Sequence, residues 1–419
     1  MSVLTKLTRA WLTRSFKPFR FTNTYDNTLN YKETRNLGLY VHIPFCKTLC
    51  VFCPYCKYVY NKDTANQYIE ALLKEIDLVG GALGEAKKQV TSLYFGGGTP
   101  ALLANDIERI IGRINKYFTI TEGIGIELHP SDVTAEKLTI LKDAGVTKIS
   151  IGIQSFQPEC LELLGRRESD WDTIFIALEK VRFETVSMDF IFALPNQTIE
   201  TIKKDIEIAF ANGANHIALY PFIDFTFTDR NFKKITNREK KKLLYEIVDY
   251  CNKKGYARDS IWTFSKHGTT KYSSMTRENF LGFGCSATTL LEDKFKINTF
   301  DIKEYHKRIN SGIMPTALSL DFSRRQRMVY YLFWAAYTMG VDPQKFDSFF
   351  GDSLEKNYGF EIWLSRILGL IKKENGQYIM TTKGSYYYHY YEQFYTLSYI
   401  DRLWRLMKNE ALPRELIIG

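Results

Sequence analysis

Cysteine is scarce in this chain, and long hydrophobic runs are absent. Seven cysteines in 419 residues are too few for a disulfide scaffold. No window approaches the roughly 18 consecutive apolar residues of a membrane span, so we expect a cytoplasmic protein that does not cross a bilayer. The net charge of +9 is spread along the chain without a compact basic block, which argues against a nucleic-acid partner. It suits a small anionic molecule or a lipid headgroup.

The first twenty residues lack the apolar core of a signal peptide. Basic residues alternate with apolar ones there, and Leu4, Leu7 and Trp11 fit one helical face. We expect residues 1–36 to form a basic arm that docks on its own domain. The alternatives are a transit peptide and contact with a membrane surface.

Short β-rich apolar runs alternate with amphipathic stretches between Leu37 and Ile223, the pattern of βα units around a parallel sheet. Six strands are expected, and they begin at Leu37, Ser92, Gly123, Lys148, Val186 and His216. Periodicity allows an open doubly wound sheet or an incomplete barrel. Polar and special residues follow five of the strands at one rim, where barrels carry their chemistry. We therefore predict an α/β fold, an incomplete TIM-like (β/α)6 barrel.

Beyond Asp224 the pattern is less regular. A lysine-rich helix near residues 239–253 and a polar stretch lead to the segment LGFGCSA, which we interpret as a closing connection. The barrel domain is thus expected to span residues 37–300. Residues 301–419 show apolar helices and a short wing strand in GQYIMTTKG, which predicts a smaller helical or winged-helix-like C-terminal domain.

Four of the seven cysteines lie within eleven residues, in the segment CKTLCVFCPYC. The spacing Cys46-x3-Cys50-x2-Cys53 lets three thiolates hold an iron-sulfur cube and leaves one iron open. A zinc site with Cys56 as fourth ligand is the alternative, but structural zinc usually joins two separated ligand pairs. Cys160, Cys251 and Cys285 are isolated, and we expect small buried hydrophobes there.

Further motifs accompany the cysteines: YVHIPFC from Tyr40, YFGGGTP from Tyr94, ELHP from Glu127, SIGIQSF from Ser150, Gly165-Arg166 and MDFIFALP from Met188. With these motifs the sequence resembles the radical S-adenosylmethionine (SAM) family over most of its length. It is most similar to the branch that contains oxygen-independent coproporphyrinogen III oxidase, the heme chaperones derived from it and class C methyltransferases. The resemblance implies a 4Fe-4S cluster, two SAM molecules, a monomer and an electron donor such as flavodoxin or ferredoxin.

The resemblance also implies roles for individual residues. The glycine segment Gly96, Gly97, Gly98 and Thr99 would meet the methionine amino group of SAM, and Glu127 would contact the cosubstrate. Gln154 and Arg166 would reach its ribose or carboxylate, and Asp189 the ribose or a second cosubstrate. Tyr40 would sit beside the cluster.

Two further stretches are candidates for binding. Gly282 and Gly284 of LGFGCSA resemble the family's glycine segment near the adenine or second-cosubstrate site. The hydroxyl-rich run Tyr272, Ser273, Ser274, Thr276 and Arg277 could bind a carboxylate or phosphate, although a plain polar loop is the simpler interpretation.

Departures from the family pattern guide the choice of reaction. The oxidase has a cysteine two residues after the third cluster cysteine, whereas Cys56 follows Cys53 by three, and the arginine-tyrosine arm before the barrel is absent from FRFTNTYDN. The chaperone's CDF and His-Asn signatures are replaced by CPY and WTFSKHG. We therefore expect a class C reaction, with methyl or methylene transfer from a second SAM to an unsaturated lipid or tetrapyrrole. Oxidase-type decarboxylation and a heme-binding chaperone are the alternatives. Cys56 is a catalytic candidate, or packs near the site.

Overall fold

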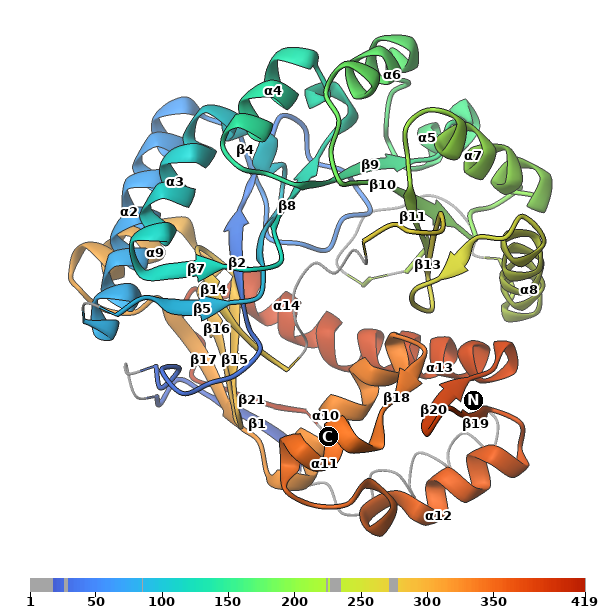
Figure 1. The fold of residues 1–419 in the computed structure, drawn as a ribbon. Coiled ribbons are helices and arrows are strands. Elements are labelled where there is room, and N and C mark those ends of the chain that lie inside the picture. Colours follow the sequence, from blue (N-terminus) through green and yellow to red (C-terminus); the bar gives the residue numbers. More distant parts are fainter. Residues whose placement is uncertain are drawn as a thin grey trace.

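The computed structural model describes residues 18–25, 29–84, 86–223, 225–226, 235–270 and 278–418. Its centre is an arc of six parallel strands, as predicted (Figure 1). In sheet order they are β2 (Leu37–Ile43), β6 (Leu93–Gly97), β8 (Ile124–Leu128), β9 (Lys148–Gln154), β10 (Thr185–Phe192) and β11 (His216–Pro221). A doubly wound sheet reverses its strand order partway, whereas here neighbours follow chain order throughout. The arc is therefore the incomplete barrel that the sequence predicts.

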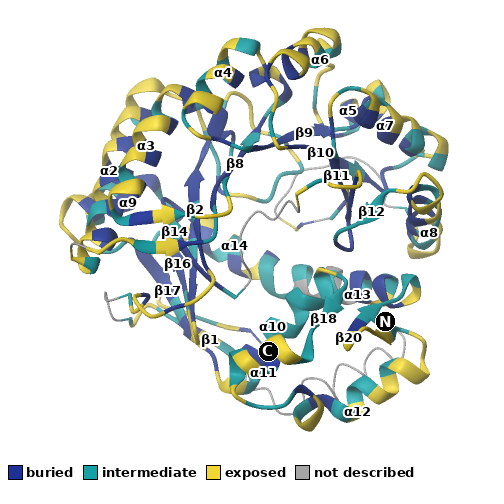
Figure 2. Cartoon of the chain, in the orientation of Figure 1, coloured by how far each residue is buried: buried dark blue, intermediate teal, exposed yellow. Residues whose placement is uncertain are grey.

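Helices cover the outer face of this arc and turn their buried sides toward it (Figure 2). They are α2 (Lys62–Gly80), α3 (Ala104–Tyr117), α4 (Ala135–Asp143), α5 (Pro158–Leu163), α6 (Trp171–Lys180), α7 (Ile199–Ala211) and α8 (Asn237–Lys253). Local sequence sets where they start: Asn61 caps α2 through the Thr64 N–H, and Thr236 forms a capping box with Glu239 at α8. The βα connections thus place each strand's carboxyl end at a common rim.

Short elements complete the barrel loops. They are the strands β3 (Phe45–Cys46), β4 (Tyr58–Val59), β5 (Lys88–Val90) and β7 (Phe118–Ile120), and the 3-10 turns η1 (Gly81–Leu83), η2 (Pro100–Leu103) and η3 (Pro130–Asp132). The β3–β4 pair brackets the cysteine segment, because Phe45 pairs with Tyr58 and Cys46 with Val59. The cysteine loop is therefore closed at its base.

The sheet continues well beyond the predicted six strands. β14 (Asn279–Phe283) runs parallel to β2, and antiparallel strands extend the sheet from there. The extension comprises β15 (Thr288–Leu291), β16 (Lys294–Asn298), β17 (Thr316–Asp321), β1 (Phe19–Thr22) and β21 (Glu415–Ile418), while β12 (Ala257–Arg258) and β13 (Thr263–Ser265) form the other edge. The sheet crosses the boundary we placed at residue 300. Part of the expected arm is β1, which pairs with β21, and residues 1–17 lie outside the described residues.

The C-terminal region is helical and carries a three-stranded sheet, as the sequence predicts. Its elements are α9 (Ile302–Asn310), α10 (Arg324–Tyr337), α11 (Pro343–Phe350), α12 (Leu354–Ile367), α13 (Thr382–Tyr395), the π-helical turn η4 (Thr396–Ile400), α14 (Asp401–Asn409), β18 (Gly340–Val341), β19 (Ile371–Glu374) and β20 (Gln377–Met380). The predicted wing strand is β20, which runs into α13. A small core of its own, centred on Met328, Phe346 and Tyr378, supports this region. No described helix is both long and apolar enough to pass through a membrane.

A buried carboxyl ties the barrel to its extension. Glu75 on α2 accepts hydrogen bonds from Gly284 N (2.6 Å), Asn298 Nδ2 (3.1 Å) and Tyr305 Oη (2.7 Å). Burial raises the pKa of Glu75 to about 7, although these donors act in the opposite direction. The carboxyl therefore favours its protonated form in the folded chain more than in the unfolded chain.

Glu75 should make stability depend on pH. Because the pKa of Glu75 is raised on folding, the stability that this carboxyl contributes is fully present below the unfolded value of 4.5 and is lost as pH rises through about 7. The free energy of unfolding of the wild type should fall relative to Glu75→Gln across this window, by up to about 1.4 kcal/mol per pH unit. Urea titrations at several pH values measure it, with exposed Glu70→Gln on the same helix as control. A difference that stays constant with pH contradicts this assignment.

Candidate functional site

The cysteine loop follows β2 at the carboxyl rim of the barrel. Cys46, Cys50 and Cys53 are all partly exposed. Lys57 Nζ reaches back into the loop and donates to the carbonyls of Cys50 (2.5 Å) and Cys53 (3.1 Å). Thr99, at the end of the glycine segment, donates its hydroxyl to Cys46 Sγ at 3.7 Å. The lysine thus folds the loop on itself, and Thr99 ties it to the neighbouring strand.

Burial and neighbouring groups shift the pKa of two of the three thiols, Cys46 and Cys53. Burial raises the pKa of Cys46 to about 11, and the Cys53 and Cys50 thiols add to this rise. Burial also raises the pKa of Cys53, which Lys57 opposes. Within the described residues no three His, Cys, Asp or Glu side chains surround a ready metal position. Three thiols on one short loop are nevertheless the donor set that iron-sulfur clusters take. The residues fit a cluster.

The glycine segment lies against this loop so closely that side chains have no room. A Cβ on Gly98 would meet Phe45 O at 2.6 Å, and one on Gly96 would meet the Tyr40 ring at 2.9 Å. Gly97 has φ +123° and a Cβ there would meet the His42 ring at 2.7 Å. Its N–H donates to Glu127 Oε2 at 3.1 Å. The glycines therefore let the backbone of β6 approach both β2 and Glu127.

Replacing Gly97 with alanine should destabilise the protein. The new methyl group would collide with His42 in a backbone conformation that L-residues avoid, at a cost of about 1–3 kcal/mol. Gly112→Ala is the matched control, because no heavy atom lies within 4 Å of a Cβ there and α3 should gain about 0.5–1 kcal/mol. Chemical denaturation measures both. Equal stabilities of the two variants would refute the steric argument.

Two carboxyls, Glu127 and Asp189, interact electrostatically across strand β9, next to the glycine segment. Glu127, at the end of β8, also accepts a hydrogen bond from Tyr94 Oη at 3.2 Å. Burial and then the negative charge of Asp189 raise the pKa of Glu127 to about 7. Burial raises the pKa of Asp189 to about 6, while hydroxyl donors lower it. A cation at this position would bind well, because it would relieve the repulsion between the two carboxylates.

Asp189 is held by polar groups that the sequence analysis missed. Ser150 Oγ donates to Asp189 Oδ2 at 2.7 Å, and Ser187 Oγ donates to Oδ1 at 3.1 Å. His216 Nδ1 lies 2.9 Å from Ser187 Oγ, and burial lowers the pKa of this histidine to about 4. Since the serine hydroxyl has one proton, neutral His216 donates to Ser187 and Ser187 donates to Asp189. The strand register aligns Ser150, Ser187 and His216 side by side.

Gln154 and Arg166 lie near the carboxyl end of β9, the strand next to β8. Gln154 ends β9 with φ +72°, an uncommon conformation for a non-glycine residue that clusters at functional sites. Arg166 donates to Gly152 O at 2.9 Å, and its guanidinium lies 5.7 Å from the ring of Phe52 in the cysteine loop. Its buried Nε has no hydrogen-bond partner among the described groups. A buried donor of this kind suits a ligand acceptor.

Tyr40 and Cys56 contact the same histidine. Tyr40 Oη lies 3.0 Å from His42 Nδ1, and His42 Nε2 lies 3.1 Å from Cys56 O. The Cys56 thiol is buried, 4.0 Å from the thiol of Cys285 and 3.4 Å from Phe300 O. These contacts give Cys56 a packing environment, which is the second of the two interpretations we left open for it. Cys285 is buried as expected, but beside a second thiol.

The glycines of LGFGCSA also have packing partners. A Cβ on Gly282 would meet Thr288 O at 2.2 Å, and one on Gly284 would meet Tyr68 Oη at 2.3 Å. Both positions thus require glycine for close approach within the protein, independently of the ligand contact that the resemblance implies. The hydroxyl-rich run from Tyr272 to Arg277 lies outside the described residues.

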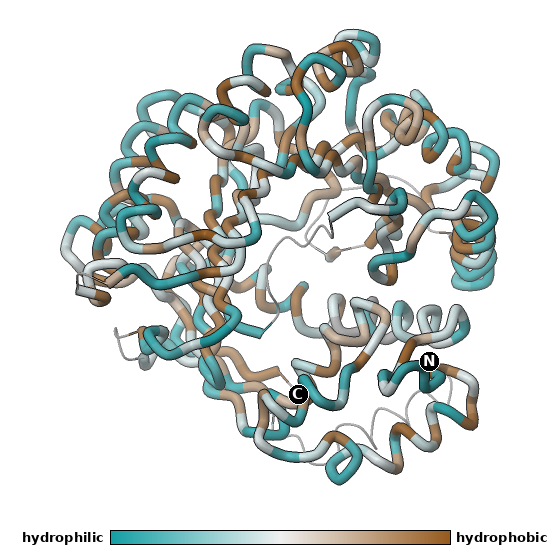
Figure 3. Tube along the Cα trace, in the orientation of Figure 1, coloured by the Kyte–Doolittle hydropathy of each residue, from teal (hydrophilic) through white to brown (hydrophobic). Residues whose placement is uncertain are grey.

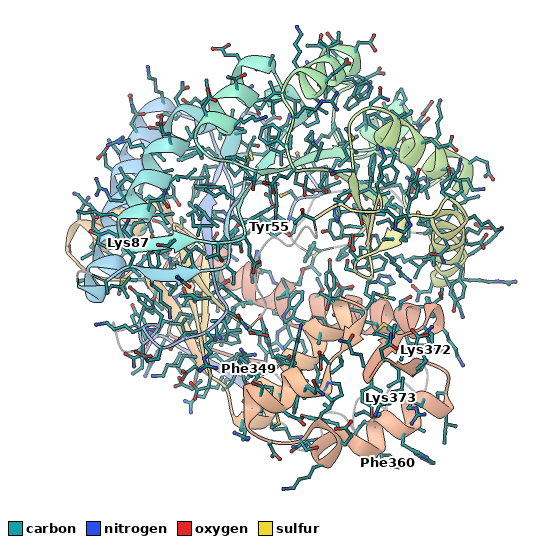
Figure 4. All side chains as sticks on the ribbon, viewed as in Figure 1. Tyr55, Lys87, Phe349, Phe360, Lys372 and Lys373 are labelled. Carbon is teal, nitrogen blue, oxygen red and sulfur yellow. The ribbon has the colours of Figure 1, made fainter. Side chains whose placement is uncertain are left out.

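Three aromatic side chains from separate elements, Tyr55, Tyr220 and Tyr337, interact with one another near Asp189, and the sequence analysis did not single them out. Tyr55 of the cysteine loop is 55% exposed and Tyr220 of β11 is 41% exposed. Interaction with Tyr337 of α10, followed by burial, Asp189 and Tyr55, raises the pKa of Tyr220. Figure 4 places Tyr55 at the centre of the view, between the barrel and the C-terminal helices. An exposed tyrosine in the otherwise buried strand HIALYP was the available signal.

Comparison with known proteins agrees with this geometry. The model of the radical SAM superfamily matches residues 40–209. The heme chaperone HemW of Lactococcus lactis is 30% identical over 371 residues, which cover 82% of this chain and 93% of the chaperone. The oxygen-independent coproporphyrinogen III oxidase of Synechocystis is 27% identical over 333 residues, 73% of this chain and 70% of the oxidase.

A solved structure gives the same picture of the fold. Coproporphyrinogen III oxidase (HemN) from Escherichia coli, described as a radical SAM enzyme, superimposes with a TM-score of 0.76. The match covers 90% of this chain and 96% of the oxidase at 22% identity. The barrel and the C-terminal region therefore share one architecture with that protein.

Proposed function

The chain belongs to the radical SAM superfamily, and on that premise we propose that it binds a 4Fe-4S cluster and SAM at the carboxyl rim and uses them on a tetrapyrrole. The observation that carries the proposal is the convergence at this rim of the cysteine loop, the Gly97–Glu127 contact and Asp189. We do not retain the methyl or methylene transfer that we expected from the sequence. The chaperone and oxidase relatives are named for heme and coproporphyrinogen, which favours the alternatives we gave beside it.

Each residue of the rim has a task in this proposal. When bound, the cluster supplies the electron that cleaves SAM to a 5'-deoxyadenosyl radical. Cys46, Cys50 and Cys53 hold the cluster, and Lys57 keeps their loop folded. Glu127 and the Gly97 backbone orient the charged methionine end of SAM, while Arg166 offers its free donor to an acceptor of the same molecule. Asp189, fixed by Ser150 and Ser187, accepts from ribose hydroxyls.

A tetrapyrrole suits the aromatic surroundings of the carboxyls. Tyr55 and Tyr220 are exposed, and Tyr220 interacts with Asp189; the flat pyrrole rings of a tetrapyrrole pack well on tyrosine faces. Because the C-terminal helix α10 contributes Tyr337, the substrate would lie between the barrel and the C-terminal region. One SAM is sufficient for this proposal, and an electron donor of the flavodoxin or ferredoxin type would feed the cluster.

Anaerobic reconstitution with iron and sulfide, followed by SAM and a reductant, tests the proposal. We expect a brown protein that forms 5'-deoxyadenosine, and mass spectrometry should show a changed coproporphyrinogen III or heme. Tight heme binding without SAM cleavage would favour the chaperone function of its relative instead. A colourless protein with stoichiometric zinc would contradict the cluster itself.

A further inference from the structure

Helix α12 carries a continuous apolar stripe on its outward face. The stripe consists of Phe360 (52% exposed), Trp363 (54%), Leu364 (38%), Ile367 (64%) and Leu368 (47%). The spacing i, i+3, i+4, i+7, i+8 puts these side chains on one side of a helix. Brown positions recur along α12 in Figure 3, and the helix lies at the periphery of the molecule (Figure 1).

The fold of the C-terminal region does not require this stripe. The opposite face of α12 supplies Leu354, Tyr358 and Ile362 to the small core around Phe346, so the helix is already anchored. The rings of Phe360 and Trp363 lie 5.7 Å apart and form one surface. Single exposed hydrophobic residues are ordinary, but a contiguous group of this size marks an interaction surface.

Cations border the stripe. Between residues 354 and 383 the chain has five basic residues, Lys356, Arg366, Lys372, Lys373 and Lys383, against three acidic ones, Glu355, Glu361 and Glu374. Lys372 pairs with Glu374 at 2.6 Å, whereas Lys373 lies over the Tyr378 ring and Lys383 donates to Leu368 O. A ring and a carbonyl do not neutralise a lysine. Figure 4 labels Phe360, Lys372 and Lys373 within the C-terminal region, at the lower right of the view.

We propose that this face, the α12 stripe with the flanking lysines of β19 and α13, docks on an anionic lipid surface. Tryptophan and phenylalanine beside leucine and isoleucine enter the boundary between headgroups and acyl chains, and lysines beside them reach the headgroup phosphates. The positive balance of the segment complements an anionic leaflet. A second copy of the chain fits less well, since a symmetric contact would bring like-charged lysines together.

Sedimentation of the full-length protein with sucrose-loaded vesicles tests this inference. We expect binding to phosphatidylcholine vesicles that contain phosphatidylglycerol, weaker binding in high salt, and little binding to phosphatidylcholine alone. The double variant Trp363→Glu/Ile367→Glu should weaken binding by at least about tenfold, because it places charge in the apolar boundary. Lys373→Glu/Lys383→Glu should do the same, since neither lysine is paired with a carboxylate among the described residues and both are available to the headgroup phosphates.

A matched control variant changes a residue of the barrel, on the opposite side of the molecule from α12 (Figure 1). Ile176→Glu changes an equally exposed residue (52%) on α6 and should leave vesicle binding unchanged. Thermal melting checks that all variants fold. Brominated lipids in the vesicles should quench tryptophan emission of the wild type, and Trp363→Phe should still bind but lose part of that quenching.

Three results would overturn the inference. If the wild-type protein does not bind anionic vesicles, a lipid partner is excluded, and an acidic protein is left as the occupant of this face. Undiminished binding of both double variants would move the lipid contact to another part of the chain. A dimer in sedimentation velocity that Ile367→Glu dissociates would make the stripe a self-association face. None of these results depends on SAM cleavage, so the proposed function stands or fails separately.

Discussion

Replacing Cys50 with alanine is expected to remove the brown colour of the reconstituted protein and abolish 5'-deoxyadenosine formation. The reason is that three thiolates hold three of the four irons, and the loss of one thiolate leaves a second iron without a protein ligand. Loss of groups that only support metal ligands already costs about 10- to 100-fold, so loss of a ligand should lower SAM cleavage by more than about 100-fold. Iron content, visible absorption and product chromatography measure the effect.

Cys160→Ala is the matched control for this experiment. Cys160 is also a free cysteine, but it lies outside the motif in the sequence and is buried in a small apolar cluster with Leu164 and Leu194, against which Phe52 of the cysteine loop packs. We expect this variant to keep its iron and its SAM cleavage. If both variants lose iron equally, the cysteine motif is not the cluster site.

Replacing Glu127 with glutamine should weaken SAM binding by about 1.5–3 kcal/mol, the worth of a hydrogen bond to a charged group. SAM is cationic, and its binding favours the ionised carboxylate. Since the pKa of Glu127 is about 7, wild-type affinity should rise as pH increases through that value, and the glutamine variant should show no such rise. Equilibrium binding by calorimetry across this pH range measures both effects without turnover.

Exposed Glu122→Gln, in the turn before β8, is the control for Glu127 and should retain wild-type affinity and pH dependence. Should Glu127→Gln keep the rise with pH, the titrating group lies elsewhere, with Asp189 as the nearest carboxyl. Should its affinity remain unchanged at every pH, the carboxyl does not contact SAM.

The six parallel strands could be predicted because each is a short β-rich run buried on both faces, such as KISIGI in β9. The later strands could not. β16, with the sequence KFKIN, and β1, with FRFT, mix basic and apolar residues, and the partners of β1 lie far away in the chain, as Phe19 pairs with Ile418. Pairing over such distances leaves no local sequence signal.

In the candidate site, too, some features could be predicted from the sequence and others could not. Motif residues such as Gly97 and Glu127 could be identified from the sequence, and the structure brings these two together. The contact between Cys56 and Cys285 joins positions 229 residues apart, and nothing in their spacing predicts it. Ser187 and His216 could have been noticed, because polar residues are unusual inside apolar parallel strands. Their shared role at Asp189 depends on strand register, which the sequence does not contain.

Transfer of deuterium from a labelled tetrapyrrole into 5'-deoxyadenosine is the most direct test of a radical reaction on a tetrapyrrole. The reconstituted protein would be incubated anaerobically with SAM, a reductant and coproporphyrinogen III or heme that carries deuterium on its side chains. We predict that label appears in 5'-deoxyadenosine as the tetrapyrrole is converted. Formation of 5'-deoxyadenosine that is unlabelled, unaffected by either tetrapyrrole and accompanied by no change in it would contradict a tetrapyrrole substrate.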